Sequence, residues 1–407
     1  MFQPGARPTI AVTSSRNIVV AGAGIGGLTA ALALAARGYR VSVFEQSARL
    51  EEAGAGIQLS PNATRALAAL GVLERLRERA VEARSLKVCD GKTGAVIVEA
   101  PLNAASADGA PWLLAARADL QQELYLAAVD HPDIELELGT TITDFAAHPR
   151  GVTAHSSRPG KGKEQNGIAL IAADGLWSGI RTRLHPDAKP VFHNLVAWRS
   201  VLQASQVPAP FSEPAVHLWL GPGGHLVHYP VAGGARINVV AIFADPWQSE
   251  DWNAAADAKS LAPAFERWAA APRAVLSAVG EFRRWALHDL PPLPRWGRGA
   301  LTLLGDAAHP MLPFLAQGAA AAIEDALVLG RHLKGASDAP TALRAYESER
   351  RSRTGRLQTA ARSTGLYYRL SGPFAFARNV ALRTMGGGGL IKRNEWIYDY
   401  DAGSARR

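Results

Sequence analysis

Cysteine is nearly absent from this sequence, which has a single one, Cys89, among 407 residues. One thiol cannot form a disulfide within the chain, so a secreted domain held together by disulfides is excluded and a reducing, cytoplasmic compartment is expected. The sequence also lacks any run of about 18 apolar residues, which excludes a helix that spans a membrane. Residues 1–16 contain Pro, Ser and Thr but no hydrophobic signal core, so we expect a disordered extension there.

Clusters of potential metal ligands and convincing nucleophilic Ser or Cys residues are also lacking, and no metal is expected. Acidic residues are outnumbered by basic ones, which gives a formal net charge of +8. Charge alone would allow a nucleic-acid partner, but the arginines are scattered and no nucleic-acid motif is present, so none is expected. A basic protein that binds a dinucleotide and a small anionic substrate fits the same balance.

The chain is long enough for two domains, or for one domain with large insertions. Its content of 48% apolar and 20% charged residues is typical of a soluble globular protein. Three glycine-rich segments, each placed after a short apolar run, carry most of the functional information.

The first of these segments follows an apolar run at residues 17–21. It reads GAGIGG at residues 22–27 and leads into a helix rich in Ala and Leu at residues 28–36. Gly22 permits the tight turn, Gly24 lets the backbone approach a pyrophosphate, and Gly27 allows the helix to pack on the strand. Glu45 ends the second strand, at the spacing expected for an acid that binds an adenosine ribose. Together these features predict dinucleotide binding, without distinguishing FAD from NAD.

The second segment is residues 300–326, where a buried apolar strand ends at Gly305 and Asp306. A loop with two prolines follows, and Gly318 then opens an alanine-rich helix. Free N–H groups and the positive end of the helix dipole would face a ligand there. Asp306 can accept hydrogen bonds from hydroxyl groups. The pattern is typical of a cofactor site.

The third segment begins where a strand at residues 168–172 runs into Asp174 and Gly175. Ser178 and Arg181 follow one turn later, which is consistent with a turn that binds a ligand.

These motifs resemble those of the single-component, FAD-dependent aromatic hydroxylases. GDAAHPMLPFLAQGAAAAIEDA, residues 305–326, is similar to their second flavin-binding motif, and most similar to the salicylate hydroxylase, 3-hydroxybenzoate 6-hydroxylase and 6-hydroxynicotinate 3-monooxygenase group. The resemblance implies an α/β fold, in which a Rossmann-like FAD-binding domain carries an inserted mixed or antiparallel β-sheet substrate domain and C-terminal helices. The resemblance implies an FAD-binding domain at residues 17–86, 112–186 and 296–335, a substrate domain at 87–111 and 187–295, and a helical region at 336–407.

The resemblance also implies a role for individual residues. The residues expected to bind FAD are Gly22, Gly24, Gly27, Glu45, Arg49, Arg117, Asp174, Asp306, Pro313 and Gly318. Those expected to line the substrate pocket are Gly56, Phe314 and Leu315.

Residues 191–243 predict an antiparallel sheet with glycine turns. A period of two places His225, Val227 and Tyr229 on one face of a strand, with Leu226 and His228 on the other. Such a face suits a strand that lines a cavity, although hydrogen-bonded sheet residues would give the same pattern.

A nearby pair, Trp198 and Arg199, could bind an anionic substrate or form a structural ion pair.

Four further segments have a predicted conformation. We expect one helix through Leu67, Leu70, Leu73 and Leu76, a loop at 157–167, a helix at 251–279 and a flexible break at 386–389.

The implied reaction uses NADH or NADPH to reduce non-covalently bound FAD, and a flavin hydroperoxide then hydroxylates an aromatic, phenolic or carboxylated ring. His225 is the predicted base, because the reactive ring is a phenolate, and Tyr229 is predicted to fix the far end of the ligand. Related rings, such as a pyridine, a quinolone or a polyketide, remain open, as does a flavin-binding protein without turnover. The expected partners are the aromatic substrate and dioxygen, and the expected state is a monomer or homodimer.

Overall fold

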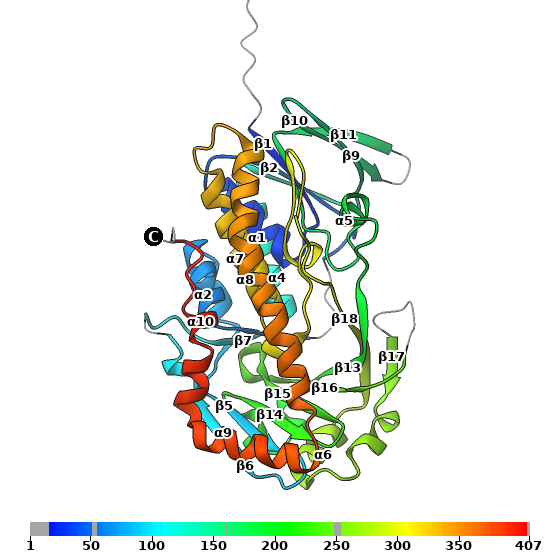
Figure 1. Cartoon of the computed structure of the whole chain (residues 1–407), viewed down its shortest axis with the longest axis vertical. Coiled ribbons are helices and arrows are strands. Elements are labelled where there is room, and N and C mark those ends of the chain that lie inside the picture. Colours follow the sequence, from blue (N-terminus) through cyan, green and yellow to red (C-terminus); the bar gives the residue numbers. More distant parts are fainter. Residues whose placement is uncertain (1–15, 51–54, 107, 159–160, 248–253, 405–407) are drawn as a thin grey trace, which may run out of the picture.

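The computed structural model describes residues 16–50, 55–106, 108–158, 161–247 and 254–404 (Figure 1). The predicted N-terminal extension lies outside the described residues, except for Arg16. A parallel sheet with its helices occupies one end of the elongated molecule and a large mixed sheet the other (Figure 1). Among the described residues no helix is long and apolar enough to cross a membrane.

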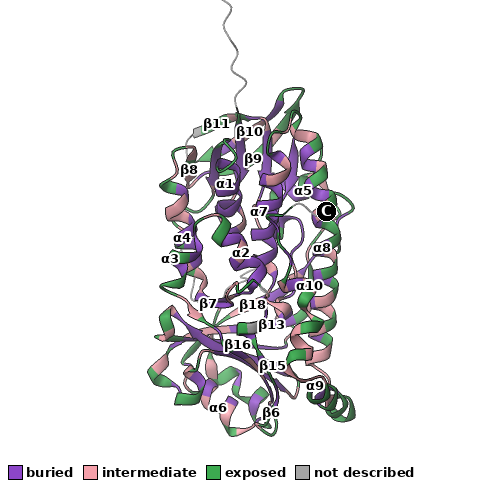
Figure 2. Ribbon diagram, turned by 90° about the vertical axis from the view of Figure 1, so that its left-hand side faces the viewer, coloured by how far each residue is buried: buried purple, intermediate pink, exposed green. Residues whose placement is uncertain are grey.

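The parallel sheet has the strand order β19-β12-β1-β2-β8, and every neighbouring pair is parallel. Its central strands are short apolar runs buried on both faces, which is why they favour this architecture. Helices α1, α4 and α7 lie beside this sheet (Figure 2), and the small side chains of α1 and α7 let these two helices pack closely on each other. The bounds are β1 Asn17–Ala21, α1 Ile25–Ala35, β2 Arg40–Glu45, α4 Arg117–Val129, β8 Ile134–Leu138, β12 Ala169–Ala172, β19 Leu301–Leu303 and α7 Gly318–Leu333.

The large sheet has eight strands in the order β17-β18-β13-β16-β15-β14-β5-β6. Neighbours are antiparallel except β14 and β5, which run parallel. The predicted α/β fold with a mixed second sheet is confirmed. The bounds are β5 Ser85–Asp90, β6 Val96–Pro101, β13 Val191–Gln203, β14 Ala215–Gly221, β15 Gly224–Val231, β16 Arg236–Ala244, β17 Ala254–Asp257 and β18 Glu281–Asp289.

Two smaller sheets complete the strand pairing. One has the order β3-β7-β4 and the other β11-β10-β9. The loop predicted at residues 157–167 is wrong where the structure describes it, since β10 and β11 pair across this region. The segment KGKEQNG carries no apolar alternation, because most of this outer strand faces solvent. The bounds are β3 Gly56–Leu59, β4 Val81–Glu82, β7 Leu113–Ala116, β9 Thr141–His148, β10 Gly151–Arg158 and β11 Lys161–Gly167.

Helix α8, Ala339–Tyr368, is 30 residues long, or about 45 Å at 1.5 Å per residue. It packs on α7 near the parallel sheet and continues to the large sheet, where it reaches α9, Gly372–Arg393 (Figure 1). The remaining helices are α2 Pro61–Ala69, α3 Leu73–Arg77, α5 Gly179–Leu184, α6 Ala270–Ser277 and α10 Glu395–Tyr398.

Two predicted helices differ from the structure. The helix expected through Leu67 and Leu76 is broken into α2 and α3, because Gly71 adopts a left-handed conformation with φ 71°. The helix expected at residues 251–279 is wrong over most of its described part: β17 pairs with β18, 3-10 turns follow, and only α6 is α-helical. Alanine favours a helix locally, but pairing with the edge of the sheet outweighs that preference.

The break predicted at residues 386–389 is present at Gly386, where non-helical geometry with φ 67° and ψ 172° kinks α9. The next glycine lets the helix approach the sheet: a Cβ on Gly387 would lie 2.0 Å from the carbonyl oxygen of Glu99 in β6. The glycine run therefore serves close packing of α9 on β6.

Candidate active site

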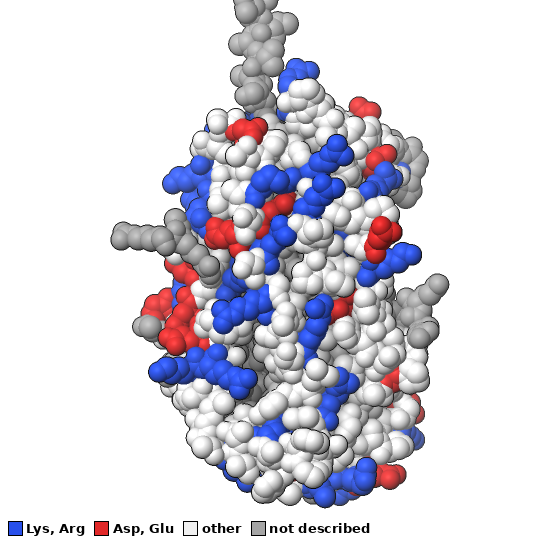
Figure 3. Space-filling view, viewed as in Figure 1, with Lys and Arg blue, Asp and Glu red and all other residues white. Residues whose placement is uncertain are grey.

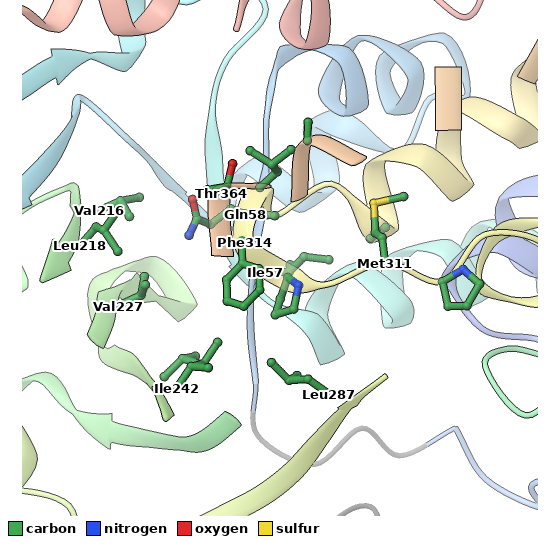
Figure 4. Close-up of a pocket in the computed structure, with 18 of the residues that line it drawn as sticks. Ile57, Gln58, Val216, Leu218, Val227, Ile242, Leu287, Met311, Phe314 and Thr364 are labelled. Atoms are coloured by element: carbon green, nitrogen blue, oxygen red, sulfur yellow. The ribbon is translucent and has the colours of Figure 1, made fainter. Parts of the chain in front are cut away.

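A cavity of about 1120 Å³ lies between the parallel sheet and the large sheet. Its wall combines the glycine loop after β1, the segment after β19 and the start of α7 with the inner face of the large sheet. Helices α8, α9 and α10 close it from the side. Figure 4 shows this space, with Met311 and Phe314 on one side and Val216 and Leu218 on the other.

The glycine loop has one position open to a ligand and two fixed by packing. Gly22 has φ 101°, and a Cβ there would lie 2.4 Å from the Ala173 oxygen. A Cβ on Gly27 would lie 1.9 Å from the Gly22 oxygen, so α1 can pack on β1 only with glycine there. A Cβ on Gly24 would meet nothing within 4 Å, and Gly24 lines the cavity. The space beside Gly24 is therefore available to a bound group.

Glu45 supports this loop from the end of β2. Its carboxylate accepts hydrogen bonds from the backbone N–H of Ala23 and of Ser47, each at 2.8 Å. Among the described residues the cavity wall does not include Glu45 or Arg49, and Arg49 is exposed. Their predicted contacts with FAD remain predictions.

Arg117 and Gly56 both line the cavity. The backbone N–H of Arg117, at the start of α4, donates to the Ala55 carbonyl at 2.8 Å. The N–H of Gly56 donates to the Asn238 side chain at 2.6 Å, and a Cβ on Gly56 would lie 2.6 Å from that side chain. The absence of a side chain at Gly56 therefore lets β3 pass beside the large sheet.

Asp174 turns its carboxylate away from the cavity and toward α5. It accepts hydrogen bonds from the Ser178 hydroxyl at 2.6 Å and from the Ile180 N–H at 3.2 Å. Burial raises the pKa of Asp174, although these hydrogen bonds oppose the shift. Its neighbours Ala173 and Gly175 line the cavity instead. Asp174 therefore holds the turn whose neighbouring residues line the cavity, and its predicted contact with FAD remains a prediction.

The segment after β19 lies beside the glycine loop, since a Cβ on Gly26 would lie 2.9 Å from the Leu304 side chain. Asp306 is exposed and lines the cavity, as do Pro313, Phe314 and Leu315. Helix α7 begins at Gly318, which also lines the cavity. Small side chains in its first turn leave the free N–H groups and the positive dipole end accessible to an anionic or electron-rich group.

A buried ion network that the sequence did not predict supports this segment. Glu324 and Asp325 of α7 bind Arg350 and Arg353 of α8, and all four side chains are buried. Burial alone would raise the pKa of Glu324, but the charges of Arg350 and Arg353 lower it.

The same network reaches the loop through Asp325. Its Oδ2 accepts from the Gly305 N–H at 3.0 Å and lies 2.6 Å from Nε2 of His309. The turn at Gly305 is thereby tied to α7 and α8.

The predicted alternation along β15 is confirmed. His225, Val227 and Tyr229 line the cavity, whereas Leu226 belongs to the core on the other face of the sheet. His228 also faces away and stacks on His217, with ring centroids 4.5 Å apart.

His225 is 2% exposed and lies among aromatic rings. Its ring centroid is 5.5 Å from that of Phe314 and 5.1 Å from that of Tyr368. Burial lowers the pKa of His225 to about 3, and the positive charge of Arg369 acts in the same direction. The imidazole is therefore neutral near pH 7 and can accept a hydrogen bond.

Tyr229 lies four residues further along the strand on the same face, with the Gln58 side chain beside its hydroxyl. Burial raises the pKa of Tyr229, so its hydroxyl stays protonated. Arg199 lines the cavity as well, with its guanidinium 4.6 Å from the ring centroid of Trp285. Trp198 faces the opposite core, so the pair suggested by the sequence is divided between the two faces.

The C-terminal helices also contribute to the cavity wall, which the sequence did not predict. Residues of α8 at helical spacing line the cavity, and so do Trp396 and Tyr398 of α10. The α8 residues are Gly355, Arg356, Thr359, Ala360, Ser363, Thr364, Tyr367 and Tyr368. No local signal in the sequence marks these residues, because the face of α8 that meets the cavity depends on how the helix packs.

Comparison with known proteins decides the family. The family model described as FAD binding domain matches residues 16–361, most of the chain. This chain belongs to that FAD-binding family. It is 36% identical to 3-hydroxybenzoate 6-hydroxylase 1 of Aquipseudomonas alcaligenes over 94% of this chain and 97% of that enzyme.

Two solved members of the family share the whole architecture. Klebsiella pneumoniae HpxO, complexed with FAD and uric acid, is 26% identical with a TM-score of 0.82, covering 94% of this chain and 96% of that one. A salicylate hydroxylase substrate complex is 25% identical with a TM-score of 0.81, covering 96% and 97%. The resemblance drawn from the three motifs is confirmed.

The cavity fits the FAD that the family binds. The open space at Gly24, the exposed Asp306 and the small first turn of α7 all border this cavity. FAD is therefore the cofactor of this chain, and the large sheet supplies the wall beyond it.

Proposed function

We propose that this protein is an FAD-dependent monooxygenase that uses NADH or NADPH and dioxygen to hydroxylate an aromatic ring by flavin hydroperoxide chemistry. One observation carries the proposal. A single cavity is lined by Gly24, Asp306 and Gly318 on the cofactor side and by His225 and Tyr229 on the side of the large sheet. A ring held against these two side chains would lie beside the cofactor.

The reaction balances with one oxygen atom going to the ring. The aromatic C–H, dioxygen, NAD(P)H and one proton give the phenol, NAD(P)⁺ and water. When bound, FAD supplies the redox chemistry of both half-reactions, and the protein contributes binding, orientation and exclusion of water.

His225 would accept a hydrogen bond from the phenolic hydroxyl of the substrate. The imidazole lines the cavity and is neutral, so a ring nitrogen can accept this hydrogen bond. A hydrogen bond from the phenol to this nitrogen shifts electron density toward the ring, which favours attack on an electrophilic oxygen. Tyr229 would orient the same substrate from further along the strand.

Apolar side chains surround the two polar ones and would keep the site dry. Phe314 and Leu315 lie on the cofactor side, and Ile242 and Leu287 line the large sheet (Figure 4). Excluding water protects a reactive oxygen species from wasteful decay to hydrogen peroxide.

Arg199 is the proposed contact for an anionic group on the substrate. Its charge acts on Tyr229, which places the two side chains near each other. Stacking on Trp285 would hold the guanidinium plane in position for a carboxylate. The relatives named for 3-hydroxybenzoate and salicylate agree with an anionic aromatic substrate.

The test is NAD(P)H oxidation with product analysis across salicylate, 3-hydroxybenzoate, 4-hydroxybenzoate and 6-hydroxynicotinate. We expect at least one ring to accelerate oxidation and to be hydroxylated with matching stoichiometry. Oxidation that yields hydrogen peroxide with every ring would point to a different substrate. A protein that holds FAD but shows no NAD(P)H oxidation with any aromatic compound would contradict the proposal.

Arg199→Met gives a second readout in the same assay. It should raise KM for carboxylated rings by roughly 10- to 100-fold, the value of a hydrogen bond to a charged group. The same substitution should raise KM less for rings that lack the carboxylate.

A further inference from the structure

The cavity wall that the large sheet forms carries polar side chains on some strands and only apolar side chains on others. Strand pairing places Ile242 of β16 opposite His225 of β15, and His225 opposite Leu220 of β14. Leu218 is opposite Val227 of β15 on one side and Val88 of β5 on the other. The cavity wall therefore continues across β15, β14 and β5.

Polar side chains are confined to one part of this wall. Arg199, His225 and Tyr229 lie on β13 and β15. The residues that line the cavity from β14 and β5 are all apolar: Val216, Leu218, Leu220, Leu86 and Val88. Strands lie about 4.8 Å apart, so this apolar part begins beside His225 and extends roughly 10 Å beyond β15.

Helices close the space over these strands with apolar and aromatic side chains. Leu382, Leu390 and Ile391 of α9 line the cavity, together with Tyr367 and Tyr368 of α8, and Arg393 lines it from the last residue of α9. Leu382 and Leu218 belong to one buried cluster, in which Leu218 is 5% exposed. The kink at Gly386 and the close approach of Gly387 to β6 set the position of this cover.

We propose that the substrate is an aromatic ring that carries an apolar substituent, such as an alkyl chain or a second ring, which lies between β14, β5 and α9. A simple hydroxybenzoate would leave these side chains without a ligand contact. We call the space bounded by Leu86, Val88, Leu218, Leu220 and Leu382 the apolar pouch. This inference rests on the proposed function and specifies the class of its substrate.

The size of the effect follows from burial of the substituent. Each methylene removed from water into the pouch contributes about 0.8 kcal/mol, or roughly a fourfold gain in affinity. The gain should stop when the chain exceeds the length of the pouch. Since the lining side chains are themselves nearly buried, linear or planar substituents should bind better than branched ones.

The experiment uses the FAD-loaded protein and two series, 3-alkylphenols and 6-alkylsalicylates, with side chains of one to six carbons. Dissociation constants come from the change in flavin absorbance on binding, without reductant. Turnover comes from NAD(P)H oxidation with quantified hydroxylated product. We expect affinity and kcat/KM to rise about fourfold per methylene over the first members of at least one series.

Two substitutions at one position test the location of the pouch. Leu218→Phe fills it and should move the optimum to shorter chains, while Leu218→Ala enlarges it and should move the optimum to longer chains. Loss of stability cannot shift the optimum in both directions. Ile97→Phe is the matched control, because Ile97 belongs to the same buried cluster but not to the cavity wall, and it should keep the original optimum.

The outcomes separate this inference from the proposed function. Hydroxylation of unsubstituted rings without any gain from chain length would overturn the apolar pouch and leave the proposed function intact. Affinity that rises with chain length, without hydroxylated product, would support the pouch and contradict the function. If both Leu218 variants changed the affinity by the same factor for every chain length, the optimum would not move and the apolar pouch would be contradicted.

Discussion

Arg353 of α8 binds both carboxylate oxygens of Glu324 in α7. Its Nε lies 2.7 Å from Oε2 and its Nη2 lies 2.7 Å from Oε1, and neither side chain reaches solvent appreciably. The same carboxylate accepts a hydrogen bond from Asn62 at 2.6 Å. This pair joins the helix that faces the cofactor to the helix that continues to the large sheet.

Removing one partner of this ion pair should destabilise the protein, because the other charge stays buried without an opposite charge. We expect Arg353→Leu to lower the free energy of unfolding by about 3–5 kcal/mol, measured by chemical denaturation of the FAD-loaded protein. Arg351→Leu is the control, since Arg351 is exposed on the same helix and should change stability by less than about 0.5 kcal/mol. Equal effects of the two substitutions would contradict a structural role for the ion pair.

Gly24 and Gly27 should fail in different ways when substituted. Gly24→Val places its side chain in the open cavity, so the protein should fold and lose FAD affinity by at least tenfold. Gly27→Ala forces a Cβ against the Gly22 oxygen, so it should reduce stability whether or not FAD is present. Circular dichroism of the apoprotein and titration with FAD distinguish the two. A stable, FAD-replete Gly24→Val protein would contradict the cofactor placement.

His225 should act as a neutral hydrogen-bond acceptor across the physiological range. Its pKa is lowered to about 3 by burial, so protonation of this residue should give no loss of kcat/KM as pH falls from 8 to 5. We expect His225→Gln to slow hydroxylation roughly 100-fold or more with little effect on flavin reduction. Stopped-flow measurement of the two half-reactions checks this. An acid limb near pH 6.5 that vanishes in the variant would contradict it.

The stacked pair His217 and His228 should make the fold sensitive to acid. Burial, with a further effect from Lys87, lowers the pKa of His217 to about 4, and burial lowers that of His228 well below its usual value. Unfolding therefore takes up protons below pH 6.5. The contribution of the two neutral histidines to the free energy of unfolding is fully present above that pH. It is lost as pH falls toward 4, by about 1.4 kcal/mol per pH unit for each histidine.

Replacing both rings with phenylalanine should flatten this dependence. Chemical denaturation between pH 7 and 4.5 measures the slope. His148→Gln is the control, because His148 is exposed on β9. The hypothesis is wrong if the double variant loses stability with acid as steeply as the parent protein.

The sequence was most informative where local geometry alone determines the structure. The glycines at 22, 24 and 27 and the period-two face of β15 follow from backbone sterics and strand pleating. Contacts between distant segments left no local signal. Nothing within α8 indicates that Arg353 meets Glu324 or that Thr359 lines a cavity, since both depend on how α8 packs. Residues 254–257 show the same limit, because their alanines favour a helix until an edge strand pairs with them.

The cofactor wall draws on both halves of the chain. Gly24 and Gly318 line the same cavity, and 318 − 24 = 294 residues of sequence separate them. During synthesis at about 5–20 residues per second, roughly 15–60 seconds pass between the two. Until then a nascent chain cannot hold FAD, however well its first βαβ unit has folded. Flavin colour in a preparation therefore reports chains that extend past the start of α7 and have folded, and a chain truncated before α7 should be colourless.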